Sequence, residues 1–235
     1  MNPRIEIDRE EFPFSLPVFT RFEELDLHPK VTFFVGENGS GKSTLLEAIA
    51  LAYGFPAEGG SKHHTYSTFD SHSNLDEKII LAKPSFPKES LFFRSESFYN
   101  LASYLDAAAR GEGGGPPRLG WTHRRSHGEG FLDTIAAYRA DGLFLMDEPE
   151  SALSVQGQLT FLAHMKRLVD CGSQFIIATH SPILLGFGQA RIYRFSEEGI
   201  HKIAYRDTEQ YQLTLEFLKN RSLYANILGL EELTE

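Results

Sequence analysis

Short runs of apolar residues alternate along the chain with segments of helical pattern, which indicates an α/β fold. The first run, Val31–Val35, ends in a glycine-rich turn at residues 36–41 and leads into a helical stretch that begins at Lys42. Two further all-apolar runs follow at residues 142–146 and Gln174–Ala178. Such unbroken runs are typical of strands that are buried on both faces of a parallel sheet.

A crossover helix is predicted between the last two of these strands, at residues 154–170. Apolar residues at helical spacing define its predicted buried face: Leu159, Leu162, Ala163, Met165 and Leu168. Farther on, the runs at residues 190–195 and 199–204 flank a polar turn and predict a β-hairpin. A final helix is expected from about Thr208.

The segment at about residues 54–130 is predicted to be an insertion or small helical subdomain within a single domain, residues 1–235. Two glycine-containing stretches in it, residues 54–73 and 110–117, are predicted to be loops. The elements expected between these loops are strands at residues 79–81 and 91–93 and a helix at residues 97–108.

Composition and charge narrow the class of protein. Apolar residues make up 41% of the chain and charged residues 23%, which excludes disorder and coiled coil as whole-chain descriptions. The net charge of −9 confines any DNA contact to a local basic patch. A single cysteine, Cys171, cannot form an internal disulfide, and no apolar run is long enough to span a bilayer. A cytoplasmic protein without membrane insertion is expected.

Residues 36–43 match the phosphate-loop pattern G-x-x-x-x-G-K-[ST] between a strand and a helix. Glycines let the backbone N–H groups curl around phosphate oxygens, while Lys42 reaches the β- and γ-phosphates and Ser43 binds Mg²⁺. We therefore predict ATP and Mg²⁺ as cofactors. The predicted nucleotide-binding residues are Gly36, Glu37, Asn38, Gly39, Ser40, Gly41, Lys42, Ser43 and Thr44.

Two carboxylates, Asp147 and Glu148, follow the apolar run at residues 142–146. In a phosphate-loop protein, a carboxylate at the end of a strand holds Mg²⁺, so Asp147 is predicted to be a metal ligand. Glu148 is placed to polarise the water that attacks the γ-phosphate.

Three further segments resemble ABC ATPases. Residues 126–129, Ser-His-Gly-Glu, are similar to the ABC signature, residues 150–154 resemble the D-loop, and His180 resembles the switch histidine. The phosphate loop and Glu47-Ala48-Ile49 are similar to SMC/RecF-type heads, specifically to stand-alone, AAA-type predicted ATPases without a coiled-coil arm. The resemblance implies a P-loop ABC ATPase head with a mixed sheet.

The resemblance also implies an ATP-dependent, head-to-tail homodimer. ATP would lie between the phosphate loop of one subunit and Ser126, Gly128 and Glu129 of the other. Lys42, Glu148 and His180 would be the catalytic residues, with His180 sensing the γ-phosphate from the side of Lys42. A monomer would then hydrolyse ATP slowly or not at all.

Three departures from the ABC pattern stand out. Residues 44–125 contain no glutamine, so the Q-loop ligand is absent or replaced. Glu96 is our substitute for this Mg²⁺ ligand, and its alternative interpretation is a carboxylate at a helix N-terminus. His127 replaces the first signature glycine, either contacting the γ-phosphate or pointing away from it. No aromatic residue is assigned to stack on adenine.

Two other clusters have simpler interpretations. The histidines of one loop, with a nearby aspartate, are more easily read as solvated residues than as metal ligands: His63, His64, His72 and Asp70. A basic and aromatic cluster fits contact with nucleotide or interface carboxylates better than contact with nucleic acid: Arg118, Trp121, Arg124 and Arg125.

These features favour an ATPase that works as an ATP-driven dimerisation switch. Its expected partner is a protein such as a nuclease, in DNA repair or phage defence, with DNA as a further partner that the net charge does not support. One alternative is the ATP-binding subunit of a membrane transporter. The other is a regulator that senses nucleotide without hydrolysing it.

Overall fold

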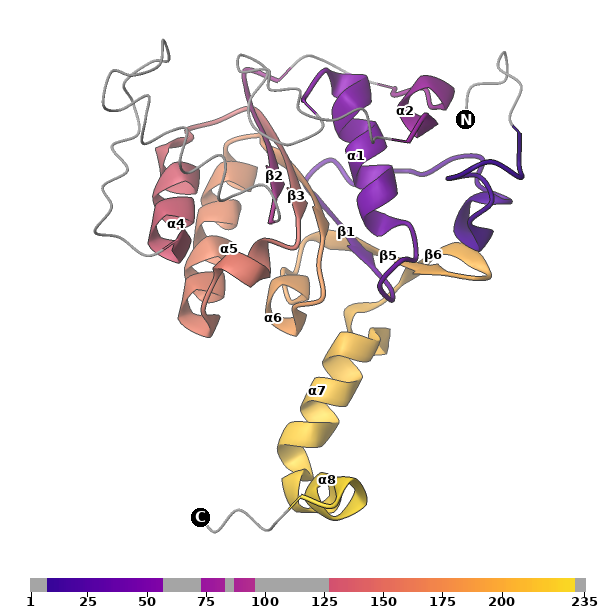
Figure 1. The fold of residues 1–235 in the computed structure, drawn as a ribbon. Helices are drawn as coiled ribbons and strands as arrows, with labels where there is room; N and C mark the ends of the chain where they lie inside the picture. The colour runs from indigo at the N-terminus through magenta and orange to yellow at the C-terminus, as the bar shows by residue number, and fades with distance from the viewer. Residues whose placement is uncertain (1–7, 57–72, 83–86, 96–126, 231–235) are drawn as a thin grey trace.

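The structure, a computed structural model, describes residues 8–56, 73–82, 87–95 and 127–230 of the chain (Figure 1). Within these residues the strands form one six-stranded sheet in the order β2-β3-β4-β1-β5-β6. All neighbouring strands pair in parallel except β6, which runs antiparallel to β5. The predicted fold class, an α/β P-loop NTPase with a mixed sheet, is confirmed.

The elements have the following bounds. The strands are β1 (Val31–Val35), β2 (Glu89–Arg94), β3 (Gly142–Asp147), β4 (Gln174–Ala178), β5 (Ala190–Ser196) and β6 (Gly199–Ile203). The α-helices are α1 (Lys42–Tyr53), α2 (Leu75–Lys78), α4 (His127–Ala137), α5 (Val155–Asp170), α6 (Pro182–Leu185), α7 (Glu209–Lys219) and α8 (Arg221–Leu228). The 3-10 helices are η1 (Pro17–Phe19), η2 (Pro149–Ala152) and η3 (Tyr205–Asp207).

Most of the elements expected from the apolar runs are confirmed. The predicted strand at residues 91–93 is longer and extends over the whole of β2. The crossover helix is α5, and Ser154 caps it by accepting a hydrogen bond from the backbone N–H of Gly157. The hairpin is β5 and β6, and Thr208 is the N-cap of α7, at the predicted start of the last helical stretch.

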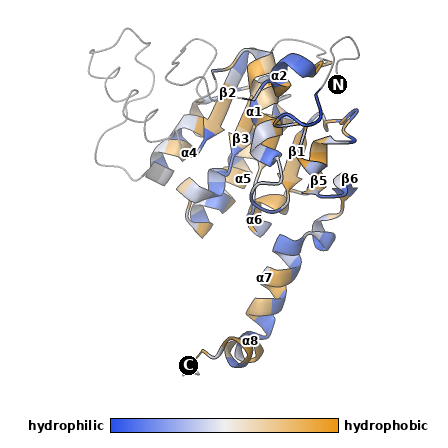
Figure 2. Cartoon of the chain, turned by 45° about the vertical axis from the view of Figure 1, so that its right-hand side comes forward, coloured by the Kyte–Doolittle hydropathy of each residue, from blue (hydrophilic) through white to orange (hydrophobic). Residues whose placement is uncertain are grey.

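Helices cover the sheet on both faces (Figures 1 and 2). Alternate side chains of each strand point to opposite faces. Phe33, Phe144 and Phe175 pack with helices α4, α5 and α6, whereas Phe34 packs with α1 in a second cluster. Because both faces are buried, the central strands are mostly apolar, as the sequence pattern predicted, although the polar Thr32 of β1 is also buried.

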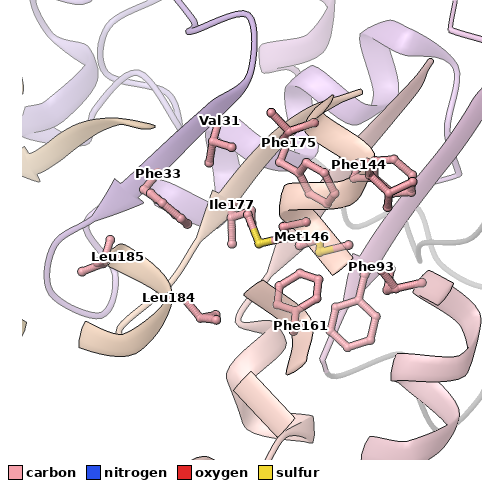
Figure 3. Packing of buried hydrophobic residues seen from close by; sticks show 14 of the residues in the cluster. Val31, Phe33, Phe93, Phe144, Met146, Phe161, Phe175, Ile177, Leu184 and Leu185 are labelled. Atoms are coloured by element: carbon pink, nitrogen blue, oxygen red, sulfur yellow. The ribbon is translucent and has the colours of Figure 1, made fainter. Parts of the chain in front are cut away.

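The predicted buried face of α5 is partly wrong. Leu159 is 49% exposed and Ala163 is exposed as well, and the fully buried aromatic residue of this helix is Phe161, which the sequence prediction left out. The buried residues follow the spacing Gly157, Phe161, Met165 and Leu168, a stripe that turns Leu159 toward solvent. Figure 3 shows Phe161 beneath the sheet, near Phe93 and Met146.

The predicted strand at residues 79–81 is wrong. Its backbone is extended at Ile79, but these residues pair with no strand of the sheet. The short helix α2 precedes them, and Ile79 and Leu81 pack on the cluster beside α1 instead. This segment thus packs two side chains partly against the cluster, leaves Ile80 62% exposed, and does not join the ladder.

Helix α4 ends at Ala137. Beyond its last residue, the backbone N–H groups of Arg139 and Ala140 donate to the carboxylate of Glu89, at 2.8 and 3.3 Å. These bonds satisfy backbone donors outside the helix and tie this connection to the start of β2.

Within the described residues, no helix combines the length and apolar character needed to cross a membrane. The predicted helix at residues 97–108 and the predicted loop at 110–117 lie outside the described residues.

The packing of Phe161 gives a test of the corrected α5 face. Phe161→Ala is expected to lower the free energy of unfolding of the nucleotide-free protein by about 3–5 kcal/mol, because it leaves a cavity between Phe131 and Phe175. Leu159→Ala, in the same helix, is expected to change it by less than about 0.5 kcal/mol. Urea unfolding of both variants measures the difference, and equal losses would contradict the observed face.

Candidate functional site

The phosphate loop lies between β1 and α1, at the carboxyl end of the sheet, and two of its glycines are required by space. Gly36 has a φ of +146°, and a Cβ there would meet the carbonyl oxygen of Phe195 at 2.4 Å. Gly41 has a φ of +94°, and its Cβ would lie 2.9 Å from the side chain of Val18. The predicted loop conformation therefore depends on close contacts with η1 and β5, which only glycine permits.

Lys42 lies inside this loop. Its ammonium donates hydrogen bonds to the carbonyl oxygens of Gly36 and Glu37, at 2.9 and 2.7 Å. Burial lowers the pKa of Lys42, while the carboxylates of Glu148, Asp147 and Glu150 act in the opposite direction. A buried ammonium among loop carbonyls is positioned to bind an anion that reaches the loop.

Ser43 and Asp147 meet as predicted for a metal site. The Ser43 hydroxyl donates to Oδ1 of Asp147 at 3.0 Å, joining the first turn of α1 to the end of β3. Burial raises the pKa of Asp147 to about 6, although the Ser43 hydrogen bond and the charge of Arg94 oppose that rise. A carboxylate held in this way gains from a bound cation.

The donor set fits Mg²⁺ bound together with phosphates. The described residues hold no group of three or more His, Cys, Asp or Glu side chains arranged around a metal. Mg²⁺ needs no such cage, because it usually takes one or two carboxylates and completes its shell with substrate phosphates and water. Asp147 and Ser43 offer one carboxylate and one hydroxyl for such a shell.

Glu148 follows Asp147 in a left-handed conformation, with φ 50° and ψ 54°. Non-glycine residues adopt it rarely, and they tend to do so at functional sites. Its backbone N–H donates to the carbonyl oxygen of Ala178 at 2.9 Å, and its carboxylate lies 3.8 Å from Nε2 of His180. Both side chains remain partly exposed.

Glu150 has a positioning role that the D-loop resemblance did not predict. Its Oε1 accepts a hydrogen bond from the backbone N–H of His180 at 2.6 Å and so holds the switch segment. Its other oxygen, Oε2, and Nε2 of His180 are buried without a hydrogen-bond partner among the described residues. These two atoms lack the hydrogen-bond partner that buried polar atoms normally have.

An ion pair between Glu47 and Arg94 supports this site and was not predicted. Nη1 of Arg94 lies 2.6 Å from Oε2 of Glu47, and the two side chains are only 23% and 14% exposed. Glu47 follows Ser43 by four positions on α1, so both lie on one face of the helix. Arg94 is the register partner of Asp147 in β2 and β3. The sequence offered only these spacings as a signal.

The remaining predicted site residues are placed unequally. Glu96 and Ser126 lie outside the described residues, and so do the histidine loop cluster and the basic and aromatic cluster. Gly128 begins the described part of α4, where a Cβ would meet the carbonyl oxygen of Ala152 at 2.6 Å. Close packing of α4 on η2 thus requires a glycine at position 128. Glu129 is exposed, and contact of Gly128 and Glu129 with nucleotide across an interface stays a prediction.

A groove of about 630 Å³ runs beside the phosphate loop. Its walls are Leu16, Pro17 and Val18 on one side and residues 194–198 on the other, with loop residues 36–40 as its floor. A second cavity, of about 470 Å³, lies at the opposite edge of the sheet, where β3 and β4 begin. It contains none of the predicted site residues, so the groove is the space adjoining the site.

Comparison with known proteins supports the ATPase character of the first part of the chain. Residues 15–100 match the AAA domain family, which is less than half of the chain. A stretch of 25 residues is 72% identical to the DNA replication and repair protein RecF of Colwellia psychrerythraea. That stretch spans 11% of this chain and 7% of that protein. The similarity to an AAA domain thus extends over residues 15–100, which include the phosphate loop and helix α1.

Solved structures of similar arrangement include ATP-binding cassettes of transporters. CbiO1 from Clostridium perfringens, part of the ABC transporter complex cbiONQ, has a TM-score of 0.42 and 18% identity, covering 85% of this chain and 88% of that one. A dimeric bacterial ABC transporter cassette has a TM-score of 0.41 and 16% identity, covering 78% and 89%. At this level, neither likeness says what this chain acts on or assembles with.

The raised pKa of Asp147 predicts that the free energy of unfolding of the protein without nucleotide and metal falls as the pH rises. As pH rises from 3.8 toward about 6, the unfolded chain loses this proton before the folded chain does, so folding becomes less favourable. Asp147→Asn is therefore expected to raise the free energy of unfolding by about 1–3 kcal/mol above that range and to do little below it.

Urea titrations at the two ends of this pH range measure the effect. Asp170→Asn is the matched control, because its carboxylate is half exposed and pairs on the surface with Lys166. A pH-independent effect of Asp147→Asn, or an equal effect of Asp170→Asn, would contradict the assignment.

The Glu47–Arg94 pair predicts a second difference. Glu47→Ala is expected to lower the free energy of unfolding by about 1–3 kcal/mol, because it leaves a half-buried guanidinium without this carboxylate. Lys88→Ala breaks the Lys88–Asp141 pair, whose side chains are 80% and 47% exposed, and should cost less than about 0.5 kcal/mol. Thermal and urea unfolding compare the two, and similar losses would contradict a supporting role.

Proposed function

We propose that this chain binds ATP with Mg²⁺, hydrolyses the γ-phosphate, and uses the cycle to close and open a head-to-tail homodimer. The observation that carries the proposal is the meeting of Ser43 and Asp147 beside a buried Lys42, with Glu148 next in the chain. A phosphate anchor, a metal carboxylate and a second carboxylate are the parts that phosphoryl transfer needs.

The phosphate loop supports ATP in two ways. Loop residues 36–44 curl around the ammonium of Lys42, so a triphosphate that enters replaces loop carbonyls as the partner of this cation. The groove beside the loop provides space for the ribose and base, between Leu16–Val18 and the β5–β6 turn. Its apolar lining, which includes Phe195, offers a surface for a nucleobase, for which the sequence analysis assigned no stacking aromatic residue.

Ser43 and Asp147 would hold Mg²⁺, which supplies charge stabilisation for the transferring phosphoryl group. Glu148 is the proposed general base, since its left-handed backbone places an acidic side chain at the sheet edge next to Asp147. His180 lies beside Glu148 and is held by Glu150 through its backbone N–H. These contacts support His180 as the residue that senses the γ-phosphate.

The dimer is proposed because buried polar atoms at this edge lack hydrogen-bond partners among the described residues. Glu150 and His180 each leave one buried polar atom unpaired within the described residues. Residues 126–129 of a second copy, with Ser126, Gly128 and Glu129, are the proposed completion of the nucleotide site. Hydrolysis would then require two copies, and ATP would act as the ligand that joins them.

The wider role is proposed from the resemblance alone. The short match to a DNA replication and repair protein accords with action in DNA repair or phage defence, together with a partner such as a nuclease. The net charge of −9 places DNA contact on a local patch or on that partner.

Kinetics as a function of protein concentration test the proposal. The ATPase rate per molecule is expected to rise with protein concentration, because active sites form only in dimers. Glu148→Gln is expected to lower the rate about 10²–10⁴-fold and to accumulate an ATP-dependent dimer on size exclusion. Lys42→Ala should abolish ATP binding and dimer together, while Lys88→Ala, an exposed lysine outside the loop, should leave both unchanged.

Other results would select the alternatives. A rate strictly proportional to protein concentration, with no dimer from Glu148→Gln and ATP, would exclude the switch. Tight Mg-ATP binding without phosphate release in a single turnover would indicate a nucleotide-sensing regulator. Co-purification with an integral membrane protein would indicate a transporter subunit.

A further inference from the structure

Helices α7 and α8 project from the body of the molecule and form what we call the C-terminal arm, residues 209–228 (Figure 1). None of the residues that the structure describes in these two helices is buried. Figure 2 shows hydrophobic bands along the ribbon of both helices. The large apolar residues exposed there are Leu213 (50%), Phe217 (41%), Leu218 (69%), Leu223 (52%), Ile227 (67%) and Leu228 (62%). An exposed apolar surface of this extent is typical of an interaction site.

The arm is attached firmly only at its base. Tyr205, just before it, donates a hydrogen bond to the carbonyl oxygen of Pro182 in α6 at 2.9 Å, and its ring packs at a tilt against that of Tyr211. Farther out, the described aromatic contact is internal, between Phe217 and Tyr224. The helices have 11 and 8 residues, and isolated helices below about 12–15 residues are marginal in water. A surface that covers the arm would stabilise it.

The arm leaves the body on the edge that carries the candidate site. It packs at its base on α6, which begins directly after His180 and Ser181. Figure 1 shows α7 extending beyond the end of the sheet where the phosphate loop and α6 lie. A second copy of the chain that faces this edge would lie within reach of the arm.

The same edge carries a second apolar patch on the body. Val155 and Leu159 are 65% and 49% exposed, and they lie one turn apart at the start of α5, directly after η2. Ahead of the arm, the other large apolar residues exposed in the described chain are Phe12 and Ile80. Both lie in segments that pack beside α1, away from this patch.

We propose that the C-terminal arm packs on the head of a second copy of this chain, against Val155 and Leu159 of the partner subunit. This rests on the proposed function, because the ATP-dependent dimer brings the facing head into reach. Two-fold symmetry repeats the contact, so each arm holds the other head. A stable interface buries about 800 Å² on each partner, more than one face of two short helices supplies, so the arm adds to the head-to-head contact.

Dimerisation of the Glu148→Gln protein tests the proposal. Leu218→Glu with Ile227→Glu is expected to raise the ATP-dependent dimer dissociation constant at least about tenfold, which corresponds to about 1.4 kcal/mol. Thr214→Glu with Ser222→Glu adds the same charge to exposed polar positions of the same helices and should leave it unchanged. Sedimentation of each protein with Mg-ATP gives the constants, and circular dichroism and ATP binding by dilute monomer show that each variant is folded.

Arm and control variants that dimerise equally would overturn the arm contact and leave the ATP-driven dimer intact. A parent protein that stays monomeric with Mg-ATP would overturn both proposals. A weaker dimer in the arm variant alone, with unchanged monomer binding, supports the contact.

Crosslinking identifies the surface on which the arm lies. In a Cys171→Ser background, which removes the chain's single cysteine, Leu218→Cys with Leu159→Cys is expected to yield a nucleotide-dependent dimer with a short, flexible bis-maleimide. Each single cysteine variant should yield far less. Equal crosslinking of Leu218→Cys alone would show arm against arm, and no dimer from the pair would exclude α5; either result overturns the proposed surface.

Discussion

The hydrogen bond from Ser43 to Asp147 joins residues that are 104 positions apart, and the candidate site depends on the sheet that brings them together. Strand β4 lies between the strands that lead to these residues. Ala178 of β4 is the register partner of Phe34 in β1 and also of Asp147 in β3. Pairing with Ala178 thus aligns the carboxyl ends of β1 and β3. Ligands of parallel sheets bind at this edge, and here the phosphate loop and the metal carboxylate lie together on it.

The same register carries the rest of the site. The carbonyl oxygen of Ala178 accepts the backbone N–H of Glu148, and the backbone N–H of Thr179 donates to Phe34. His180 follows directly, so its position relative to Glu148 is fixed by backbone bonds on both sides. A shift of β4 by one residue would turn its side chains to the other face and separate these groups.

The polar groups of this edge make unfavourable contributions to the free energy of folding, which a bound ligand would reduce. Burial opposes the charge of Lys42 and of Asp147, Glu148 holds a left-handed backbone, and Glu150 keeps one buried oxygen unpaired. Binding of a triphosphate with a cation supplies both signs of charge at once. The free energy of the empty site is therefore coupled to occupancy, which is the coupling that a ligand-driven switch requires.

Sequence patterns reached the phosphate loop and the Asp147–Glu148 pair because these are local: a strand, a turn and a helix contain the whole signal. They did not predict the Glu47–Arg94 pair or the Glu150–His180 hydrogen bond. Each of these contacts joins segments that are distant in the sequence, and the apolar pattern does not determine how such segments are placed against one another. The exposed Leu159 shows the same limit, since the apolar periodicity of α5 admits more than one face. The extended segment at residues 79–82 has strand-like residues, and only the complete sheet shows that it pairs with no strand.

Two kinds of incompleteness lie on one edge of the molecule, and a nucleotide satisfies only one of them. Unpaired polar atoms of Glu150 and His180 can be met by phosphate, cation or a partner's backbone. Leu218 and Ile227 cannot, because a triphosphate offers no apolar surface to bury them. Nucleic acid is no better suited to them, since its affinity for proteins comes largely from phosphate contacts with cationic side chains and this chain carries a net charge of −9. The arm is therefore matched by a protein surface, and the edge from which it projects is the one that nucleotide would join to a second head.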